Sequence, residues 1–121
     1  MKSSTENSLR YGQVVLVDFP YTNLKQSKLR PAVVVSSQAF HSSKPDAIFV
    51  AITSQLNPLD AVAETPIEQW QQAGLHSPSV LKSIIATIQR DLVYEHLGYL
   101  AAADVIKLDT MLKKMIAISH V

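Results

Sequence analysis

An arginine followed by a proline is the most specific chemical signal in this sequence. Pro31 fixes its own φ and restricts Arg30 to extended backbone, so the guanidinium is presented from the stiff beginning of a strand. A guanidinium stays charged at neutral pH and forms paired hydrogen bonds with phosphate oxygens. Such a group is suited to stabilise the charge that develops on a phosphorane. The alternative interpretation is an ion pair with Asp18 at the end of the preceding strand.

The segment before this arginine, residues 20–30, is basic and contains no acid. Tyr21, Lys25 and Lys28 lie in it, and three cations with an aromatic ring can follow a phosphate backbone and stack a base. An ordinary solvated hairpin loop explains the same composition. A second polar group, Thr53 with Ser54 and Gln55, ends a later β-rich run and could donate to an anion, or could simply cap a turn.

Other chemistries have little support in the composition. The sequence has no cysteine, which excludes disulfide scaffolds, zinc ribbons and thiol nucleophiles. Its histidines have no spacing typical of metal ligands, and each is interpreted as a surface residue; they are His41, His76, His96 and His120. With only 3 glycines there is no phosphate-binding loop. We therefore expect neither a metal nor a cofactor.

Three β-rich runs must position these groups. They are residues 13–19, 31–37 and 46–53. In the third run, alternation places Val50 and Ile52 on one face and Phe49 and Ala51 on the other. Pro31 is expected at the first residue of the second strand, where a missing N–H is tolerated.

The second half of the chain predicts shorter elements and one helix. Residues 67–73 are expected to form one or two helical turns that end at Gly74, and short strands are expected at 79–82, 84–88 and 93–97. Apolar residues at helical spacing predict a helix over residues 102–118. A helix after many short strands indicates a mainly β fold, a small curved sheet or barrel with one docked helix.

With 121 residues, 47% of them hydrophobic, the chain has the size and composition of a single domain. We expect residues 1–10 to be a flexible tail and residues 11–121 to be the domain. The net charge of +1 does not point to nucleic acid, so any basic surface must be local. No secretory signal and no membrane span is evident, and a cytoplasmic protein is the expectation.

Several ordered blocks carry a family resemblance. Residues 11–22 read YGQVVLVDFPYT, residues 28–36 read KLRPAVVVS and residues 51–54 read AITS; GL at 74–75, PSV at 78–80, ATI at 86–88 and LGYL at 97–100 follow. In order and spacing these blocks resemble the MazF/PemK toxin family over about residues 11–118. The resemblance implies the SH3-like β-barrel of the CcdB/MazF-type toxins with a C-terminal α-helix, usually as a homodimer.

The same resemblance implies an activity and a partner. Such proteins are metal-independent endoribonucleases that cleave single-stranded RNA by attack of its own 2′-hydroxyl, and an acidic antitoxin protein holds them inactive. By position, Arg30 and Thr53 take the catalytic places of the family. The expected RNA-binding residues are Tyr21, Lys25, Lys28, Ser54, Gln55, Ser79 and Lys82.

One departure from the family pattern bears on activity. Many members carry an arginine on a late strand, in a stretch like Gln-x-Arg-Thr, and Ala86 stands at that position here. Our hypothesis is that Lys82 partly replaces this cation. Two alternatives to a ribonuclease remain open: a CcdB-like toxin that binds a protein target without cutting RNA, and a degenerate member that only binds antitoxin. Metal-free RNA cleavage would separate the three.

Overall fold

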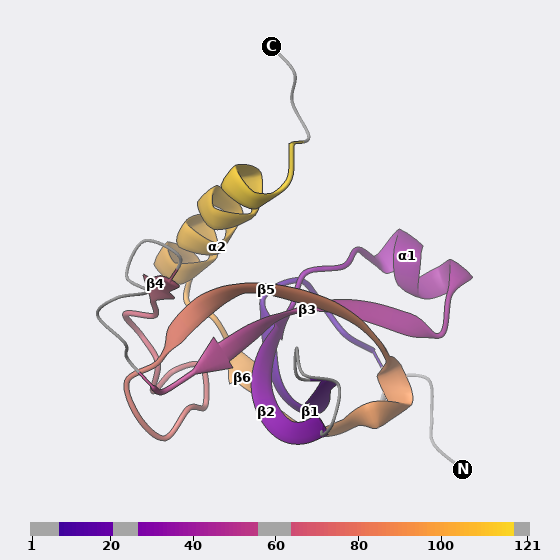
Figure 1. Ribbon diagram of the computed structural model, residues 1–121, viewed down its shortest axis with the longest axis horizontal. Coiled ribbons are helices and arrows are strands. Elements are labelled where there is room, and N and C mark those ends of the chain that lie inside the picture. Colours follow the sequence, from indigo (N-terminus) through magenta and orange to yellow (C-terminus); the bar gives the residue numbers. More distant parts are fainter. Residues whose placement is uncertain (1–7, 21–26, 56–63, 118–121) are drawn as a thin grey trace.

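The computed structural model describes residues 8–20, 27–55 and 64–117, and it consists of one curved antiparallel sheet with two α-helices (Figure 1). The strands are β1 (Gln13–Pro20), β2 (Ser27–Val34), β3 (Asp46–Thr53), β4 (Glu64–Pro66), β5 (Val80–Gln89) and β6 (Val93–Tyr99). The helices are α1 (Gln38–Ser43) and α2 (Ala102–Met115), with the 3-10 turn η3 (Arg90–Leu92) between β5 and β6.

The strand order is β4-β5-β3-β2-β1-β6, and adjacent strands in this order pair antiparallel. Within the described residues the two end strands, β4 and β6, do not pair with each other, so the expected barrel is an open, strongly curved sheet. The β-rich class and the C-terminal helix are confirmed. The helix ends at Met115, a few residues before the predicted boundary at 118.

The second strand begins earlier than predicted. It starts at Ser27, so Pro31 lies inside β2 opposite Leu16 of β1. The pairing of β2 with β3 begins only at Ala32, which leaves residues 27–31 paired on the β1 side alone. A proline in a strand is tolerated where one edge is unpaired, and this explains how the strand extends through it.

The two strands predicted at 79–82 and 84–88 are a single strand, β5. The prediction placed a break at Ser83. The structure has a shift of register there instead, because Val50 pairs with Ile85 while Ile52 pairs with Leu81. A bulge of this kind adds residues to one strand and bends it without ending it.

Three short elements were absent from the sequence prediction: α1, β4 and η3. Residues 67–73 form a hydrogen-bonded turn that Gly74 ends, with φ of +83°, as expected. The amide of Leu75 donates to the carbonyl of Trp70 and the amide of Gly74 donates to the carbonyl of Gln71, which is the Schellman pattern.

The expectation that residues 1–10 form a flexible tail is wrong at Leu9, near the end of that segment. Leu9 is 1% exposed, and the side chain of Gln38 donates to its carbonyl.

The apolar residues form two clusters, one on each face of the sheet. The first lies between the sheet and α2 and includes Val50, Ile52 and Leu108. The second includes Phe49 and Ala51, which confirms the predicted alternation in β3. Both β5 and β6, which are far apart in the strand order, contribute side chains to the second cluster, so the sheet curls around it.

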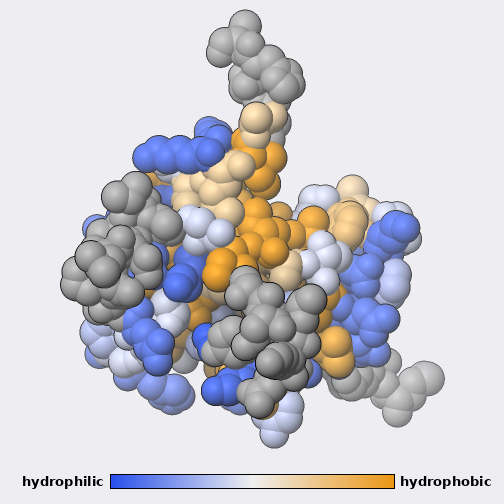
Figure 2. Space-filling view, viewed as in Figure 1, coloured by the Kyte–Doolittle hydropathy of each residue, from blue (hydrophilic) through white to orange (hydrophobic). Residues whose placement is uncertain are grey.

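The strand cores are buried within one chain, with Val15, Val33 and Phe49 all at 0% exposure. Half-buried apolar side chains remain on the α2 side, among them Val35 and Met115. Figure 2 shows apolar surface gathered between α2 and α1, over β5. In the described part of the chain no helix is both long and apolar enough to cross a membrane.

Candidate functional site

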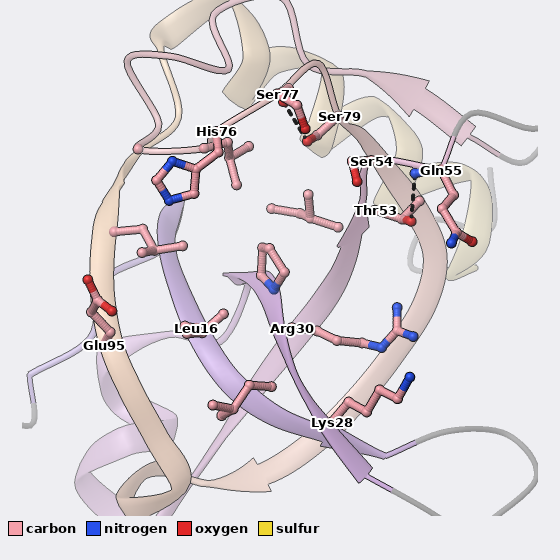
Figure 3. Close-up of a pocket in the computed structure, with 16 residues that line it drawn as sticks. Leu16, Lys28, Arg30, Thr53, Ser54, Gln55, His76, Ser77, Ser79 and Glu95 are labelled. Carbon is pink, nitrogen blue, oxygen red and sulfur yellow. Dashed lines mark hydrogen bonds between the residues drawn. The ribbon is translucent and has the colours of Figure 1, made fainter.

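The described surface contains a groove of about 410 Å³. Strands β1, β2, β3 and β6 and the turn before β5 contribute its walls. Figure 3 shows the groove with its lining side chains. The volume lies in the range of pockets that hold small ligands or single groups of larger ones, about 300–1,000 Å³.

The groove brings the two predicted catalytic residues to the same end. Arg30 and Thr53 both line it, and Figure 3 shows the Arg30 side chain extending to the side where Thr53 and Gln55 lie. Arg30 is half-buried, and removal of water lowers the pKa of its guanidinium from the ordinary arginine value. The group still carries its charge at neutral pH, and reduced hydration strengthens its interaction with an anion.

The hydroxyl of Thr53 is oriented by the turn that follows β3. The backbone amide of Gln55 donates to the Thr53 Oγ1 at 3.1 Å. Because that bond uses a lone pair of the oxygen, the hydroxyl proton remains to donate to a ligand. Ser54 and Gln55 are exposed and line the groove beside it. The turn-capping and anion-donor interpretations of this triplet are therefore compatible.

Lys28 also lines the groove, and Figure 3 places it beside Arg30. Ser79 lines the groove as well, but its hydroxyl donates to the carbonyl of Ser77 at 2.9 Å, so it offers a ligand acceptors rather than a free donor. Tyr21 and Lys25 lie outside the described residues.

Lys82 is not part of this site. Its Nζ lies 3.4 Å from Glu64 Oε2, a carboxylate on the neighbouring strand whose side chain is 4% exposed, and Lys82 is not among the residues that line the groove. Ala86 pairs with Phe49 and packs against the second core cluster. The structure therefore gives no support to the hypothesis that Lys82 replaces a cation in the groove.

The opposite wall of the groove contains residues that the sequence did not single out as functional, His76 and Glu95. His76 follows the turn that Gly74 ends, and Glu95 lies on β6. The turn is held against β6 by close backbone contact: a Cβ at Gly74 would lie 2.1 Å from the carbonyl oxygen of Leu97, and one at Gly98 would lie 2.8 Å from Ala73. Only glycine permits this approach.

A buried carboxylate fixes the other end of the same turn. Asp104 of α2 is 0% exposed and accepts hydrogen bonds from the amides of Glu68 and Gln69, both at 2.9 Å. Helix α2 thus caps the turn that carries His76 to the groove. No spacing rule reveals such a contact between residues 36 positions apart. Among the described residues, no three or more histidine, aspartate or glutamate side chains are grouped so as to hold a metal ion.

Comparison with known proteins identifies the family. The sequence model of the family of PemK-like, MazF-like toxins of type II toxin–antitoxin systems matches residues 10–116. The chain belongs to this toxin family. The match covers every strand and the whole of α2, so the groove with Arg30 and Thr53 lies in the family's own fold.

Solved structures agree on the fold. A mycobacterial endoribonuclease in complex with its cognate antitoxin matches with a TM-score of 0.72 and 19% identity, over 94% of this chain and 100% of that one. MazF of Deinococcus radiodurans matches with a TM-score of 0.71 and 20% identity, over 90% and 96%. A chain of the MazE–MazF complex of the same organism gives 0.70 and 19%, over 91% and 97%. The PemK/MazF-type fold predicted from the sequence is confirmed.

Proposed function

We propose that this toxin is a metal-independent endoribonuclease that cleaves single-stranded RNA. The observation that carries the proposal is the juxtaposition of Arg30, Lys28 and Thr53 at one end of the groove, with the hydroxyl proton of Thr53 left free to donate. Two cations and a hydroxyl donor suit a phosphodiester. The mycobacterial neighbour, an endoribonuclease, supports the same reaction class.

The proposed chemistry uses the substrate, these side chains and water. The 2′-oxygen of RNA forms a bond to the adjacent phosphorus and the bond from phosphorus to the 5′-oxygen breaks, which leaves a 2′,3′-cyclic phosphate and a 5′-hydroxyl. The 2′-oxygen gives its proton to water and the 5′-oxygen takes one from water. Arg30 offsets the additional negative charge of the phosphorane, and Thr53 holds a phosphate oxygen so that attack is in line.

The proposed protein partner is an acidic antitoxin. Lys28 and Arg30 on the groove would attract a carboxylate-rich peptide, and such a peptide would occupy the place of RNA. Complexes of neighbours with their cognate antitoxins support this partner. We also propose that the protein acts in the cytoplasm, where RNA and antitoxin are made.

A homodimer is part of the proposal. Its support is the apolar surface between α2 and α1 (Figure 2). Partly buried apolar side chains packed against the first core cluster, among them Val35, Ile85 and Met115, add to it. Contiguous apolar patches on soluble proteins commonly mark protein interfaces. Light scattering at micromolar concentration is expected to give twice the chain mass; a monomer would contradict the dimer and leave the ribonuclease proposal intact.

A second candidate is a toxin-family member that binds antitoxin, or a protein target as CcdB does, without cutting RNA. The observation that favours it is the absence from the groove of the family's late-strand cation. Ala86 stands at its position and packs against the core, and Lys82, the hypothetical replacement, pairs with Glu64. Fewer cations in the groove mean weaker stabilisation of a phosphorane.

One experiment separates these functions. The purified protein is incubated with a long single-stranded RNA in EDTA, and the ends of the products are mapped. Cleavage that leaves 5′-hydroxyl and 2′,3′-cyclic phosphate ends is expected. Intact RNA at high protein concentration, with antitoxin binding retained, would instead establish the binding-only function.

A further inference from the structure

The two ends of the groove differ in charge. Lys28 and Arg30 line one end, and Glu95 with His76 lines the other (Figure 3). Both His76 and Glu95 are exposed side chains at the opening. A carboxylate repels phosphate, so the nucleic-acid backbone belongs at the cationic end. The part of RNA that fits beside Glu95 is the edge of a base.

The floor between the two ends is apolar and suits a flat ring. Leu16 pairs with Pro31 on one side and with Glu95 on the other, so these three side chains form a row across β2, β1 and β6. Ile52, Leu75 and Leu97 line the same groove. A base bound there would rest on aliphatic surface while its polar edge meets the two side chains at the rim.

The hydrogen-bonding groups at the rim select among bases. A carboxylate only accepts, and a neutral imidazole has one N–H that donates. Guanine presents two adjacent donors, its ring N–H and its amino group, followed by a carbonyl acceptor. We propose that Glu95 and His76 form a specificity site that binds the Watson–Crick edge of a guanine beside the cleaved bond, with both donors on Glu95 and the carbonyl on His76.

The other bases match this pair less well. Cytosine and adenine each offer one amino group to the carboxylate, and the neighbouring ring nitrogen is an acceptor that faces it unfavourably. Uracil offers a single N–H between two carbonyls. Because guanine alone presents two adjacent donors, it is the base that the carboxylate binds in the bidentate manner.

This inference rests on the proposed ribonuclease activity, and its test uses the full chain with a random-sequence RNA pool. The ends of the products are sequenced for the wild type, for Glu95→Gln and for His76→Ala. Asp91→Asn, an exposed acid outside the groove, is the matched control for lost charge. We expect the wild type and the control to enrich guanine at one fixed position beside the cut.

A glutamine at position 95 presents an amino group to a donor of guanine, so Glu95→Gln is expected to lose that enrichment while still cutting RNA. With short substrates, kcat/KM is measured once with guanine and once with uracil at the selected position. The ratio of the two values is expected to be about 5- to 150-fold lower for Glu95→Gln than for the wild type, the usual value of a bidentate base contact. His76→Ala is expected to lower the same ratio less, because only one bond is removed. Inosine in place of guanine, which lacks the amino group, is expected to reduce wild-type cleavage.

The outcomes are distinguishable. A wild type that cuts without any preference for guanine, or a folded Glu95→Gln with an unchanged preference, overturns the inference and leaves the ribonuclease proposal standing. A Glu95→Gln variant that weakens only the binding of an antitoxin peptide also overturns it, since this end of the groove would then serve a peptide. If the wild type cuts no RNA at all, the proposed function fails, and this inference fails with it.

Discussion

The amide of Gln55 donates to the hydroxyl oxygen of Thr53 across a turn that leaves β3, over 3.1 Å. This bond fixes the rotamer of the hydroxyl group and leaves its proton for another acceptor. The neighbouring element, β2, supplies Arg30 to the same end of the groove. A strand terminus and the strand beside it thus present one neutral donor and one cation together.

The first prediction concerns this pair. Thr53→Val removes the hydroxyl and keeps the β-branched shape, and Arg30→Ala removes the cation. Each is expected to lower the rate of RNA cleavage about 10²–10³-fold, the usual loss when one preorganised donor is removed. Single-turnover cleavage of a mapped substrate measures it, with circular dichroism to verify folding. The matched control is Thr110→Val on α2, whose hydroxyl only bonds the carbonyl of Ile106. Wild-type rates for folded Arg30→Ala would show that the site is wrongly assigned.

The second prediction concerns Lys28, which is exposed at the cationic end of the groove. Lys28→Gln is expected to weaken RNA binding with little change in the rate of the chemical step. If Lys28 contacts one phosphate, the slope of log K against log salt concentration should fall by about 0.7, the value for a single-stranded contact. Lys113→Gln, on the exposed face of α2, is the control that changes net charge equally. An unchanged slope would place Lys28 outside the bound RNA.

The sequence pointed to some residues of this groove and missed others. Arg30 and Thr53 were predicted from the family resemblance and from their places beside runs of β-branched residues, and both line the groove; their catalytic roles stay a prediction. The place of Glu95 and His76 in the groove could not be predicted. It depends on contact between the turn at Gly74 and Leu97 of β6, which is a tertiary property. The presence of Gly74 was visible in the sequence, but its partner was not.

The short elements show the same limit. Strand β4 has 3 residues and is defined by its pairing with β5, so no local pattern could reveal it. Helix α1 has 6 residues and no buried side chain, and its only local signal is Ser37, whose hydroxyl accepts from the amide of Phe40. Lys82 was misplaced because the register shift in β5 sets which way its side chain points.

The third prediction tests the glycine contact that positions His76. Gly74→Ala places a Cβ 2.1 Å from the Leu97 carbonyl oxygen and also strains a backbone with φ of +83°. It is expected to lower the free energy of unfolding by at least about 2 kcal/mol. Gly12→Ala is the control for strain alone, since φ is +87° but the new Cβ meets only a Val105 methyl at 3.5 Å. Urea unfolding of both variants measures the difference, and equal losses would mean that the close contact contributes nothing.

The fourth prediction concerns Lys82 and Glu64, which lie outside the groove. Lys82→Ala leaves the 4% exposed carboxylate without its cation and is expected to destabilise the fold by about 1–3 kcal/mol. Cleavage by the folded variant is expected to stay at the wild-type rate. The double variant Lys82→Met with Glu64→Leu should recover most of the stability, because neither charge is then buried. A large loss of cleavage with unchanged stability would return Lys82 to the site.

The fifth prediction is a pH dependence that arises in α1. Partial burial lowers the pKa of His41, the positive charge of Arg90 lowers it further, and a backbone hydrogen bond at Leu9 acts in the opposite direction. Its Nε2 lies 2.6 Å from the buried Ser36 hydroxyl, which also accepts from the amide of Ile48. The guanidinium of Arg90 is fixed nearby, since it donates to the carbonyls of His41 and Lys44 at 2.9 and 2.7 Å. The folded protein therefore favours the neutral imidazole.

A group whose pKa is lower in the folded state binds a proton more readily when the chain unfolds. The stability due to neutral His41 is thus fully present above the unfolded value, about 6.5, and declines as the pH falls from there toward the lower folded pKa. His41→Gln is uncharged at every pH and should remove this part of the decline. Unfolding free energies of the wild type and the variant, measured between pH 7.5 and 5, are expected to converge as the pH falls. Because both proteins keep the same carboxylates, the difference between the two curves isolates His41, and parallel curves would contradict the assignment.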